Sequence, residues 1–172
     1  MRIQWFNEHT PMPWANGRGT SYEISRGGGE VWDWRVAIAP VVEPGPFSAL
    51  AGVDRHLVVL DEAPLALTID GTTQLARRGE VVAFAGESNV IAELPEGPTR
   101  DLGLMIRRGV ATGSMSVVSV GVGFGRVIVA LEESRVVSEG SSVMLTVGDA
   151  LIGEQSESVE VVSGVVCVIE VD

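Results

Sequence analysis

The feature that most constrains the fold of this chain is a succession of short apolar segments separated by glycine and proline turns. Val31–Ala39 shows the pattern, because Trp34, Val36 and Ile38 alternate with polar or small residues. A period of two residues is typical of a β-strand with one buried face. Further strands are expected at His56–Leu60, Leu65–Asp70, Val81–Ala85, Val90–Leu94, Leu102–Arg107, Met115–Val120, Phe124–Leu131, Val143–Val147, Ala150–Ile152, Val159–Val162 and Val165–Val171. No amphipathic helical segment accompanies them, so the sequence predicts an all-β protein.

A faint internal repeat divides these strands into two sets. Gly79–Ser88 contains a Gly-acid turn, an apolar strand and a second Gly-acid turn, and Gly148–Ser156 repeats that order. This rhythm is typical of a jelly-roll hairpin. We therefore expect two small stacked jelly-roll β-barrels, an N-terminal one over residues 1–108 and a C-terminal one over residues 109–172.

The bulk composition limits the classes of partner. Apolar residues make up 45% of the 172 residues, as in a well-buried globular protein. The net charge is −11, and no basic stretch is longer than Arg77–Arg78 or Arg107–Arg108, so we expect no nucleic-acid partner. The apolar runs are far shorter than the roughly 20 residues that span a bilayer, and Met1–Trp14 lacks the core of a signal peptide. The sequence predicts a cytoplasmic protein with no membrane partner.

Scarcity of reactive side chains limits the chemistry. The chain has two histidines, His9 and His56, one cysteine, Cys167, and no lysine. One subunit therefore cannot form a three-histidine metal site, a Schiff base or an internal disulfide, and we expect no metal and no cofactor. The remaining arginine, carboxylate, amide and aromatic groups favour recognition of a small anionic metabolite.

The two halves of the chain also differ in chemistry. From Gly109 onwards there is no His, Trp, Tyr or Asn, and ten of the twelve arginines precede that point. We therefore expect any site in the first half, and we expect the second half to serve as scaffold or as the interface of a homodimer.

A first candidate segment is Pro13–Glu23. Trp14 offers a flat apolar wall, Asn16 offers amide donors and an acceptor, and Gly17 allows the backbone to approach a ligand closely. Glu23 follows on an expected strand. The alternative is a glycine-rich turn that leads into an edge strand, with Trp14 capping the core.

Arg35 defines a second candidate segment. If Trp34 points to the core, Arg35 points to the opposite face beside Ala37 and Ala39, whose small side chains leave room for a cavity. A buried arginine needs a carboxylate partner. The candidate partners are Glu23, Asp33, Asp54 and Asp101. The alternative is an arginine on the outer face of the sheet in a surface ion pair, which stabilises little.

Two further segments carry charged groups next to strands. Asp54 and Arg55 precede an apolar strand that begins at His56, where a cupin-type barrel often carries metal ligands, although a lone histidine is more often structural. Asp101 precedes the expected strand Leu102–Arg107 and shares a face with Gly103, Met105 and Arg107, and it could orient an arginine.

Together these segments resemble the HutD/Ves family. The similar segments are Met12–Thr20 with Glu23-Ile24, Asp33–Ala39, Gly45–Ser48, Gly52–Arg55 and Arg100–Met105. The resemblance implies a bicupin without the usual metal ligands, and a role in regulating histidine utilisation through a bound pathway intermediate. Two departures from the family pattern, Arg18 and Gly103, put the identity of the ligand in doubt.

Under this interpretation Arg35, with Arg55, binds a ligand carboxylate through paired hydrogen bonds. Asn16 and the backbone near Gly17 would bind a second polar group, Trp14 would supply the apolar wall, and Glu23 and Asp101 would hold the arginines. Thr20 and Asp54 complete the candidate set. Urocanate, formiminoglutamate and formylglutamate fit such a site.

Two other functions remain open at this point. One is an isomerase, a lyase or a metal-dependent cupin enzyme, with Glu23 or His56 as general base. The other is a structural or protein-interaction module.

Overall fold

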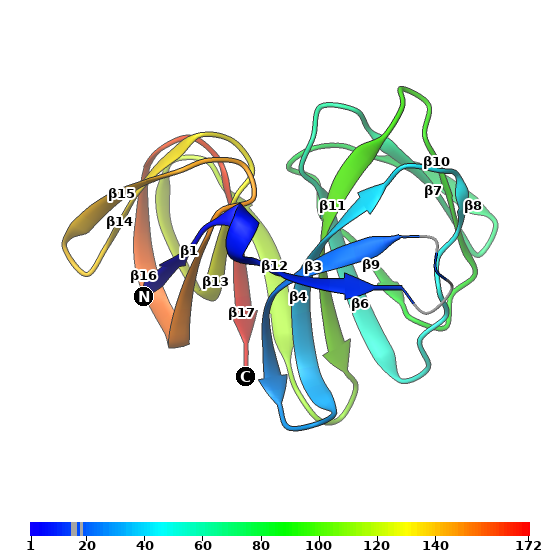
Figure 1. Ribbon diagram of the computed structural model, residues 1–172, viewed down its shortest axis with the longest axis horizontal. Coiled ribbons are helices and arrows are strands. Elements are labelled where there is room, and N and C mark those ends of the chain that lie inside the picture. The colour runs from blue at the N-terminus through cyan, green and yellow to red at the C-terminus, as the bar shows by residue number, and fades with distance from the viewer. Residues whose placement is uncertain (15–16, 18) are drawn as a thin grey trace.

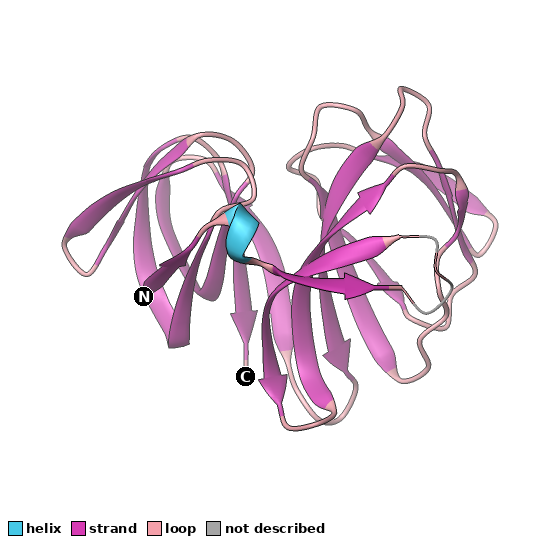
Figure 2. Cartoon of the chain, viewed as in Figure 1, coloured by secondary structure: helices cyan, strands magenta, loops and turns pink. Residues whose placement is uncertain are grey.

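The computed structural model describes residues 1–14, 17 and 19–172 and consists almost entirely of β-strands (Figure 1, Figure 2). The N-terminal half contains β1 (Arg2–Gln4), β2 (Thr10–Pro13), β3 (Thr20–Gly28), β4 (Trp32–Val41), β5 (Gly45–Pro46), β6 (Val53–Val59), β7 (Leu65–Ile69), β8 (Thr72–Ala76), β9 (Val82–Ala85), β10 (Val90–Glu93) and β11 (Thr99–Arg107). The C-terminal half contains β12 (Gly113–Val118), β13 (Gly121–Ala130), β14 (Ser134–Ser138), β15 (Ser141–Leu145), β16 (Ala150–Ser163) and β17 (Val166–Val171). Among the described residues the one helical element is a 3₁₀ turn, Phe6–Glu8. The prediction of an all-β protein is confirmed.

The strands form three sheets in two lobes. A six-stranded sheet has the order β2-β3-β4-β11-β6-β9, and a four-stranded sheet has the order β5-β10-β7-β8. These two sheets make the lobe on the right of Figure 1, which we call the N-terminal barrel. A seven-stranded sheet, β12-β17-β13-β16-β14-β15 with β1 beside β16, makes the other lobe, which we call the C-terminal barrel.

Strand alternation in the six-stranded sheet separates two apolar cores. Trp34, Val36 and Ile38 of β4 point to the side of the C-terminal barrel, where they pack against residues such as Val127 and Ile169. On the other face lies the interior of the N-terminal barrel, with a smaller apolar cluster: Val41, Leu57, Val59, Leu65, Leu67, Ala76, Val82, Val90 and Ala92. The sheet is therefore buried on both faces, as its nearly continuous apolar strands require.

The C-terminal barrel has a filled apolar interior. Its cluster contains Ile128, Ala130, Val136, Leu145, Leu151, Val159, Val161, Val166 and Val168. All nine are aliphatic, and each is at most 2% exposed. No charged side chain belongs to this cluster.

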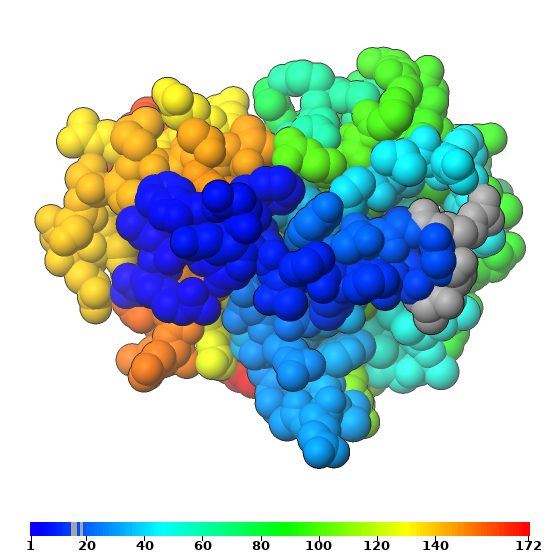
Figure 3. Space-filling model, in the orientation of Figure 1, coloured from blue at the N-terminus to red at the C-terminus, as the bar shows by residue number. Residues whose placement is uncertain are grey.

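The first residues of the chain cross from one lobe to the other. β1 pairs antiparallel with β16, so Ile3 lies opposite Leu151. Figure 3 shows the N-terminal segment lying across both lobes. The division at residue 108 stays a prediction, and this pairing places residues 2–4 in the C-terminal sheet. Over the described residues, no helix has the length and apolar character needed to span a membrane.

Candidate functional site

The register of three central strands creates a polar hollow inside the N-terminal barrel. Residues directly opposite each other in antiparallel strands share a face of the sheet. Across β4, β11 and β6 the inward rows are Arg35–Met105–Arg55, Ala37–Gly103–Leu57 and Ala39–Asp101–Val59. Successive rows are about 7 Å apart. The middle row carries the small residues Ala37 and Gly103, so space opens between the two arginines of one row and the carboxyl of another.

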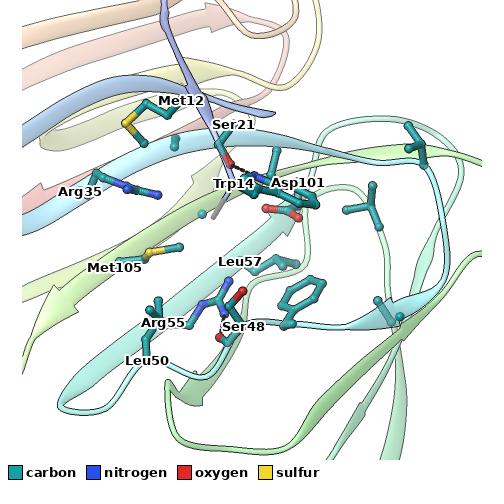
Figure 4. Close-up of a pocket in the computed structure, with 18 of the residues that line it drawn as sticks. Met12, Trp14, Ser21, Arg35, Ser48, Leu50, Arg55, Leu57, Asp101 and Met105 are labelled. Carbon is teal, nitrogen blue, oxygen red and sulfur yellow. Dashed lines mark hydrogen bonds between the residues drawn. The ribbon is translucent and has the colours of Figure 1, made fainter. Parts of the chain in front are cut away.

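A cavity of about 420 Å³ occupies this space. Its floor is the six-stranded sheet, and its rim includes Trp14 and the segment from Val42 to Leu50. The volume suits a small metabolite. Figure 4 shows Arg35, Arg55 and Asp101 reaching into the same space from three strands.

Arg35 is a mostly buried cation with unused hydrogen-bonding capacity. Its side chain is 19% exposed, and its Nε lies 4.0 Å from Glu23 Oε2, too far for a hydrogen bond. Within the described residues, both of these atoms are buried without a hydrogen-bond partner. Burial lowers the pKa of Arg35 and the Glu23 charge opposes that shift, but an arginine stays protonated at neutral pH. The guanidinium therefore carries a positive charge at the cavity wall.

Arg55 is held by aromatic rings. Its guanidinium carbon lies 5.0 Å from the centre of the Phe47 ring and 5.1 Å from that of Phe84. Nη1 donates one long hydrogen bond, 3.4 Å, to the carbonyl of Ser48. Burial lowers the pKa of Arg55, and the charge of Asp101 opposes the shift. The rings fix the side chain while most of its N–H donors stay available.

Asp101 is the buried carboxyl of the cavity. The residue is 6% exposed. Burial raises its pKa to about 7, and the nearby Arg55 charge partly opposes this. Over the described residues, no hydrogen bond stabilises the carboxylate, so desolvation dominates.

Trp14 forms an apolar wall of the cavity. Its indole Nε1 donates a 2.7 Å hydrogen bond to Ser21 Oγ, drawn in Figure 4. The ring lies over Gly19, where any Cβ would come within 2.6 Å of it. Met12 and Met105 line the same space with flexible thioethers.

The other predicted residues that the structure describes lie outside the cavity lining. Glu23 stands behind Arg35 as its ion-pair partner. Asp54 points to the opposite side of β6 from Arg55, and Arg108 Nε donates to its Oδ1 at 2.8 Å. Thr20 is on the opposite face of β3 from Ser21, and Asn16 lies outside the described residues. The Gly17 N–H donates to the Trp14 carbonyl at 2.9 Å, so Gly17 closes a turn.

Sequence reasoning missed several residues of the cavity wall. Phe47 and Ser48 belong to the segment Gly45–Ser48, which carried the family resemblance but received no role. Ser21 was not among the candidate residues, although it accepts the hydrogen bond from Trp14. The pattern Gly-Pro-Phe-Ser beside a buried arginine is the signal that could have found the aromatic support of Arg55.

The described residues contain no group of three or more His, Cys, Asp or Glu side chains that could hold a metal ion. His56 belongs to the cavity lining, but it lies between Arg55 and Leu57 in β6, so strand alternation directs its side chain to the other face of the sheet. His9 lies at the junction of the two barrels. The two histidines therefore do not meet.

Comparison with solved structures supports the cupin-like fold. A cupin 2 conserved barrel domain protein from Leptotrichia buccalis superimposes with a TM-score of 0.60 at 11% identity, over 99% of this chain and 95% of that chain. At this level of identity the likeness concerns the fold alone. The prediction of a jelly-roll, cupin-like architecture is confirmed.

More similar proteins carry HutD-type names. An uncharacterized 21.2 kDa protein in the hutC 3′ region of Pseudomonas putida is 38% identical over 102 residues, which cover 57% of this chain and 54% of that protein. Protein Ves of Citrobacter koseri is 35% identical over 99 residues, which cover 55% of this chain and 52% of that protein. The matched part thus spans about half the length of these curated relatives.

The family assignment rests on a longer match. The structure of HutD from Pseudomonas fluorescens SBW25, in a formate condition, has a TM-score of 0.83 and 29% identity, over 99% of this chain and 97% of that one. The HutD family model matches residues 6–167, nearly the whole chain. This protein therefore belongs to the HutD family.

Proposed function

We propose that this protein binds a small organic carboxylate in the cavity of the N-terminal barrel, and that it does so in a regulatory role connected with histidine utilisation. The observation that carries the proposal is the pair of arginines. Arg35 and Arg55 face one cavity from two strands, and over the described residues one long hydrogen bond, from Arg55 Nη1 to the Ser48 carbonyl, is all that occupies their terminal donors.

The electrostatics of the cavity favour an anion. Both guanidiniums are largely removed from water, which lowers the pKa of each and strengthens any charge-assisted hydrogen bond that they form. Glu23 approaches Arg35 only to 4.0 Å, so it neutralises part of the charge without occupying the donors. A ligand carboxylate would complete the donor set that the protein leaves open.

The connection with histidine utilisation rests on the relatives. The Pseudomonas putida protein is described by its place in the hutC 3′ region, and the Pseudomonas fluorescens protein bears the name HutD. These names support a role near histidine utilisation, and the arginines of the cavity support an acidic ligand. Urocanate, formiminoglutamate and formylglutamate are therefore the first compounds to test.

The enzyme alternative has less support. Glu23 lies behind Arg35 and outside the cavity lining, and His56 faces away from the central row. Glu23 is thus separated from a molecule in the cavity, whereas His56 belongs to the cavity lining but lies between the inward residues Arg55 and Leu57. The interaction-module alternative does not account for two arginines that face one cavity.

Titration calorimetry with arginine variants tests the proposal. Arg35→Met and Arg55→Met keep the aliphatic stem and remove the donors. Arg107→Met is the matched control, since Arg107 extends from β11 outside the cavity and approaches Asp33 at 3.9 Å. Loss of a charge-assisted hydrogen bond weakens binding by roughly 10- to 100-fold. We expect that loss in Arg35→Met and Arg55→Met, and no more than about a twofold change in the control.

Two results would refute the proposal. One is that none of the three candidate acids binds the wild-type protein at millimolar concentration. The other is that an acid binds but keeps its affinity in Arg35→Met and in Arg55→Met, which would place its site elsewhere.

A homodimer and a cytoplasmic location also stay predictions. Val122 and Phe124 of β13 are 71% and 53% exposed on the C-terminal barrel, as a weak interface there would require. Light scattering of the purified protein across a concentration series distinguishes a dimer from a monomer.

A further inference from the structure

Asp101 sets a second requirement for the ligand. Its carboxyl lies inside the cavity, the residue is 6% exposed, and no hydrogen bond from the described residues stabilises it. A buried carboxylate that lacks hydrogen bonds is costly, and native proteins rarely leave one so. Asp101 thus presents an acceptor to the cavity, and Arg35 presents donors to the same space.

Asp101 and the two arginines are separated along the direction of β11. Asp101 is four residues from Met105 on β11, and Met105 is opposite both Arg35 and Arg55. Four residues of strand span about 13 Å, and the arginine side chains reach back over part of that length. Gly103 leaves the floor between them without a side chain. A short, extended molecule can therefore touch an arginine at one end and Asp101 at the other.

We propose that the ligand is a short acid whose far end carries an N–H donor, and that Asp101 accepts a hydrogen bond from this donor while Arg35 and Arg55 bind the carboxylate. This inference rests on the proposed function. It narrows the ligand class from carboxylates in general to acids that end in an amide, an amidine, an imidazole or an ammonium group. A second carboxylate that faced Asp101 with no N–H donor beside it would be repelled, so the same residue selects against simple dicarboxylates. Formiminoglutamate and formylglutamate also carry two carboxylates, but each has an N–H group beside one of them that can donate to Asp101.

Glutarate and glutaramate form a matched pair of probes. They have the same length and shape, and they differ in that glutaramate ends in an amide where glutarate ends in a second carboxylate. Titration calorimetry at pH 8.5 keeps Asp101 ionised, since its pKa is about 7. We expect the wild-type protein to bind glutaramate at least about tenfold more tightly than glutarate, because a buried acceptor rejects a ligand that cannot donate to it.

Two variants of Asp101 separate recognition from folding. Asp101→Asn is nearly isosteric and can donate to a carboxylate, so the preference should fall to parity or reverse in favour of glutarate. Asp101→Leu keeps the size of the side chain but offers no polar group. The affinity for glutaramate should therefore fall about tenfold, while the affinity for glutarate stays equal or rises. Circular dichroism and thermal melts confirm that both variants are folded before the titrations are compared.

A pH series supplies an independent readout. Among the described residues, the charged or titratable groups that face Asp101 or line its cavity are Arg55 and His56 on β6, Arg35 on β4 with Glu23 of β3 behind it, and Glu43 after β4. Because His56 also titrates near neutral pH, the comparison with Asp101→Leu isolates the contribution of Asp101. Below the pKa of Asp101 the carboxyl is protonated and can donate. The preference for glutaramate over glutarate should therefore shrink from pH 8.5 to pH 5.5 in the wild-type protein and change little in Asp101→Leu.

The outcomes distinguish this inference from the proposed function. If the wild-type protein binds the two probes equally at pH 8.5, or if Asp101→Asn leaves their ratio unchanged, the role of Asp101 is wrong while carboxylate binding stands. If neither probe binds, or if Arg35→Met binds both as tightly as the wild-type protein, the site itself is wrong and this inference fails with it.

Discussion

The two barrels of this protein fill their interiors in opposite ways. The interior of the C-terminal barrel is packed with aliphatic side chains, including Ile128, Leu145 and Leu151. The N-terminal barrel gives part of its interior to a cavity with two arginines and an aspartate on its wall. Burying charged groups costs free energy that aliphatic packing would return. The comparison indicates that the C-terminal barrel supplies stability, which allows the N-terminal barrel to keep a polar site that is costly to bury.

A matched pair of alanines should give the largest contrast between the barrels. Ala130 of β13 is fully buried in the C-terminal interior, and Ala37 of β4 lines the cavity. Ala130→Leu should destabilise the protein by about 1–3 kcal/mol or more, because no space exists for the added carbons. Ala37→Leu should change stability by less than about 1 kcal/mol, since its side chain extends into the cavity. Chemical denaturation measures both values.

In ligand binding the order of the two variants should be reversed, with the larger effect in Ala37→Leu. Ala37→Leu fills the space beside Gly103 and should abolish binding of glutaramate, whereas Ala130→Leu, where it folds, should bind normally. Equal destabilisation by the two substitutions would show that the cavity is not open in solution, and the contrast between the barrels would disappear.

Two buried aspartates, one associated with each barrel, form the next contrast. Asp149, 4% exposed, accepts hydrogen bonds from the Phe6 N–H at 2.9 Å, from the Thr146 N–H at 2.8 Å and from the Thr146 hydroxyl at 2.7 Å. Asp149→Asn replaces one acceptor oxygen with an NH2 donor, so at least one of these hydrogen bonds is lost. The free energy of unfolding should fall by about 1–3 kcal/mol. Asp101 has no such bonds from the described residues, so at pH 8 Asp101→Asn should leave stability unchanged or raise it.

The stability difference between Asp101→Asn and the wild-type protein should change with pH in a defined direction. The folded protein holds a proton on Asp101 up to a pKa of about 7, while the unfolded chain releases it near the ordinary value of 3.8. The folded state binds more protons in that window, so this residue makes stability fall as pH rises from about 4 to 7. The difference in unfolding free energy between Asp101→Asn and the wild-type protein should therefore grow in favour of the variant over that range. A difference that is independent of pH would mean that Asp101 is solvated or hydrogen-bonded in the folded state.

Local periodicity explains which parts of the site were predictable from the sequence. The alternation in β4 placed Trp34 in one core and Arg35 beside Ala37 and Ala39 on the other face, and the structure confirms this arrangement. The same rule shows why Asp54 and Arg55, as neighbours on one strand, could not both face the cavity. Thr20 and Ser21 are a second pair of this kind. Period two is a property of the strand itself, so it can be read without knowing the partner strand.

Long-range pairing explains what was not predictable. Nothing in Arg2–Gln4 indicates that it joins β16, because antiparallel pairing depends on hydrogen bonds and packing supplied by a distant segment. The aromatic support of Arg55 likewise comes from Phe47 and Phe84, which lie in different parts of the chain. The role of each candidate residue in binding stays a prediction that the calorimetry above addresses.

The N-terminal segment offers the smallest test, since it joins the two barrels. His9 is 4% exposed, its Nε2–H donates to the Gly148 carbonyl at 2.8 Å, and Gln4 Nε2 donates to its Nδ1 at 3.2 Å. This arrangement requires a neutral imidazole. Burial lowers the pKa of His9, although the Gly148 carbonyl, Asp149 and Glu8 oppose the shift. Below about pH 6.5 the unfolded chain takes up a proton that the folded state resists, so stability falls as the pH decreases.

His9→Gln should lower the free energy of unfolding by about 1 kcal/mol at pH 8. The loss of stability below pH 6.5 should be smaller in this variant than in the wild-type protein. His56→Gln is the matched control, because burial lowers the pKa of His56 as well but the residue lies in β6, away from this junction. Hydrogen exchange separates the two histidines. In the wild-type protein the amides of β1 should exchange faster at pH 5.5 than the intrinsic pH dependence predicts, and this excess should vanish in His9→Gln and persist in His56→Gln. An excess that persists in both variants would show that protonation of His9 does not release β1 from β16, and that the two barrels are joined at this point by backbone pairing and by the Phe6–Asp149 hydrogen bond instead.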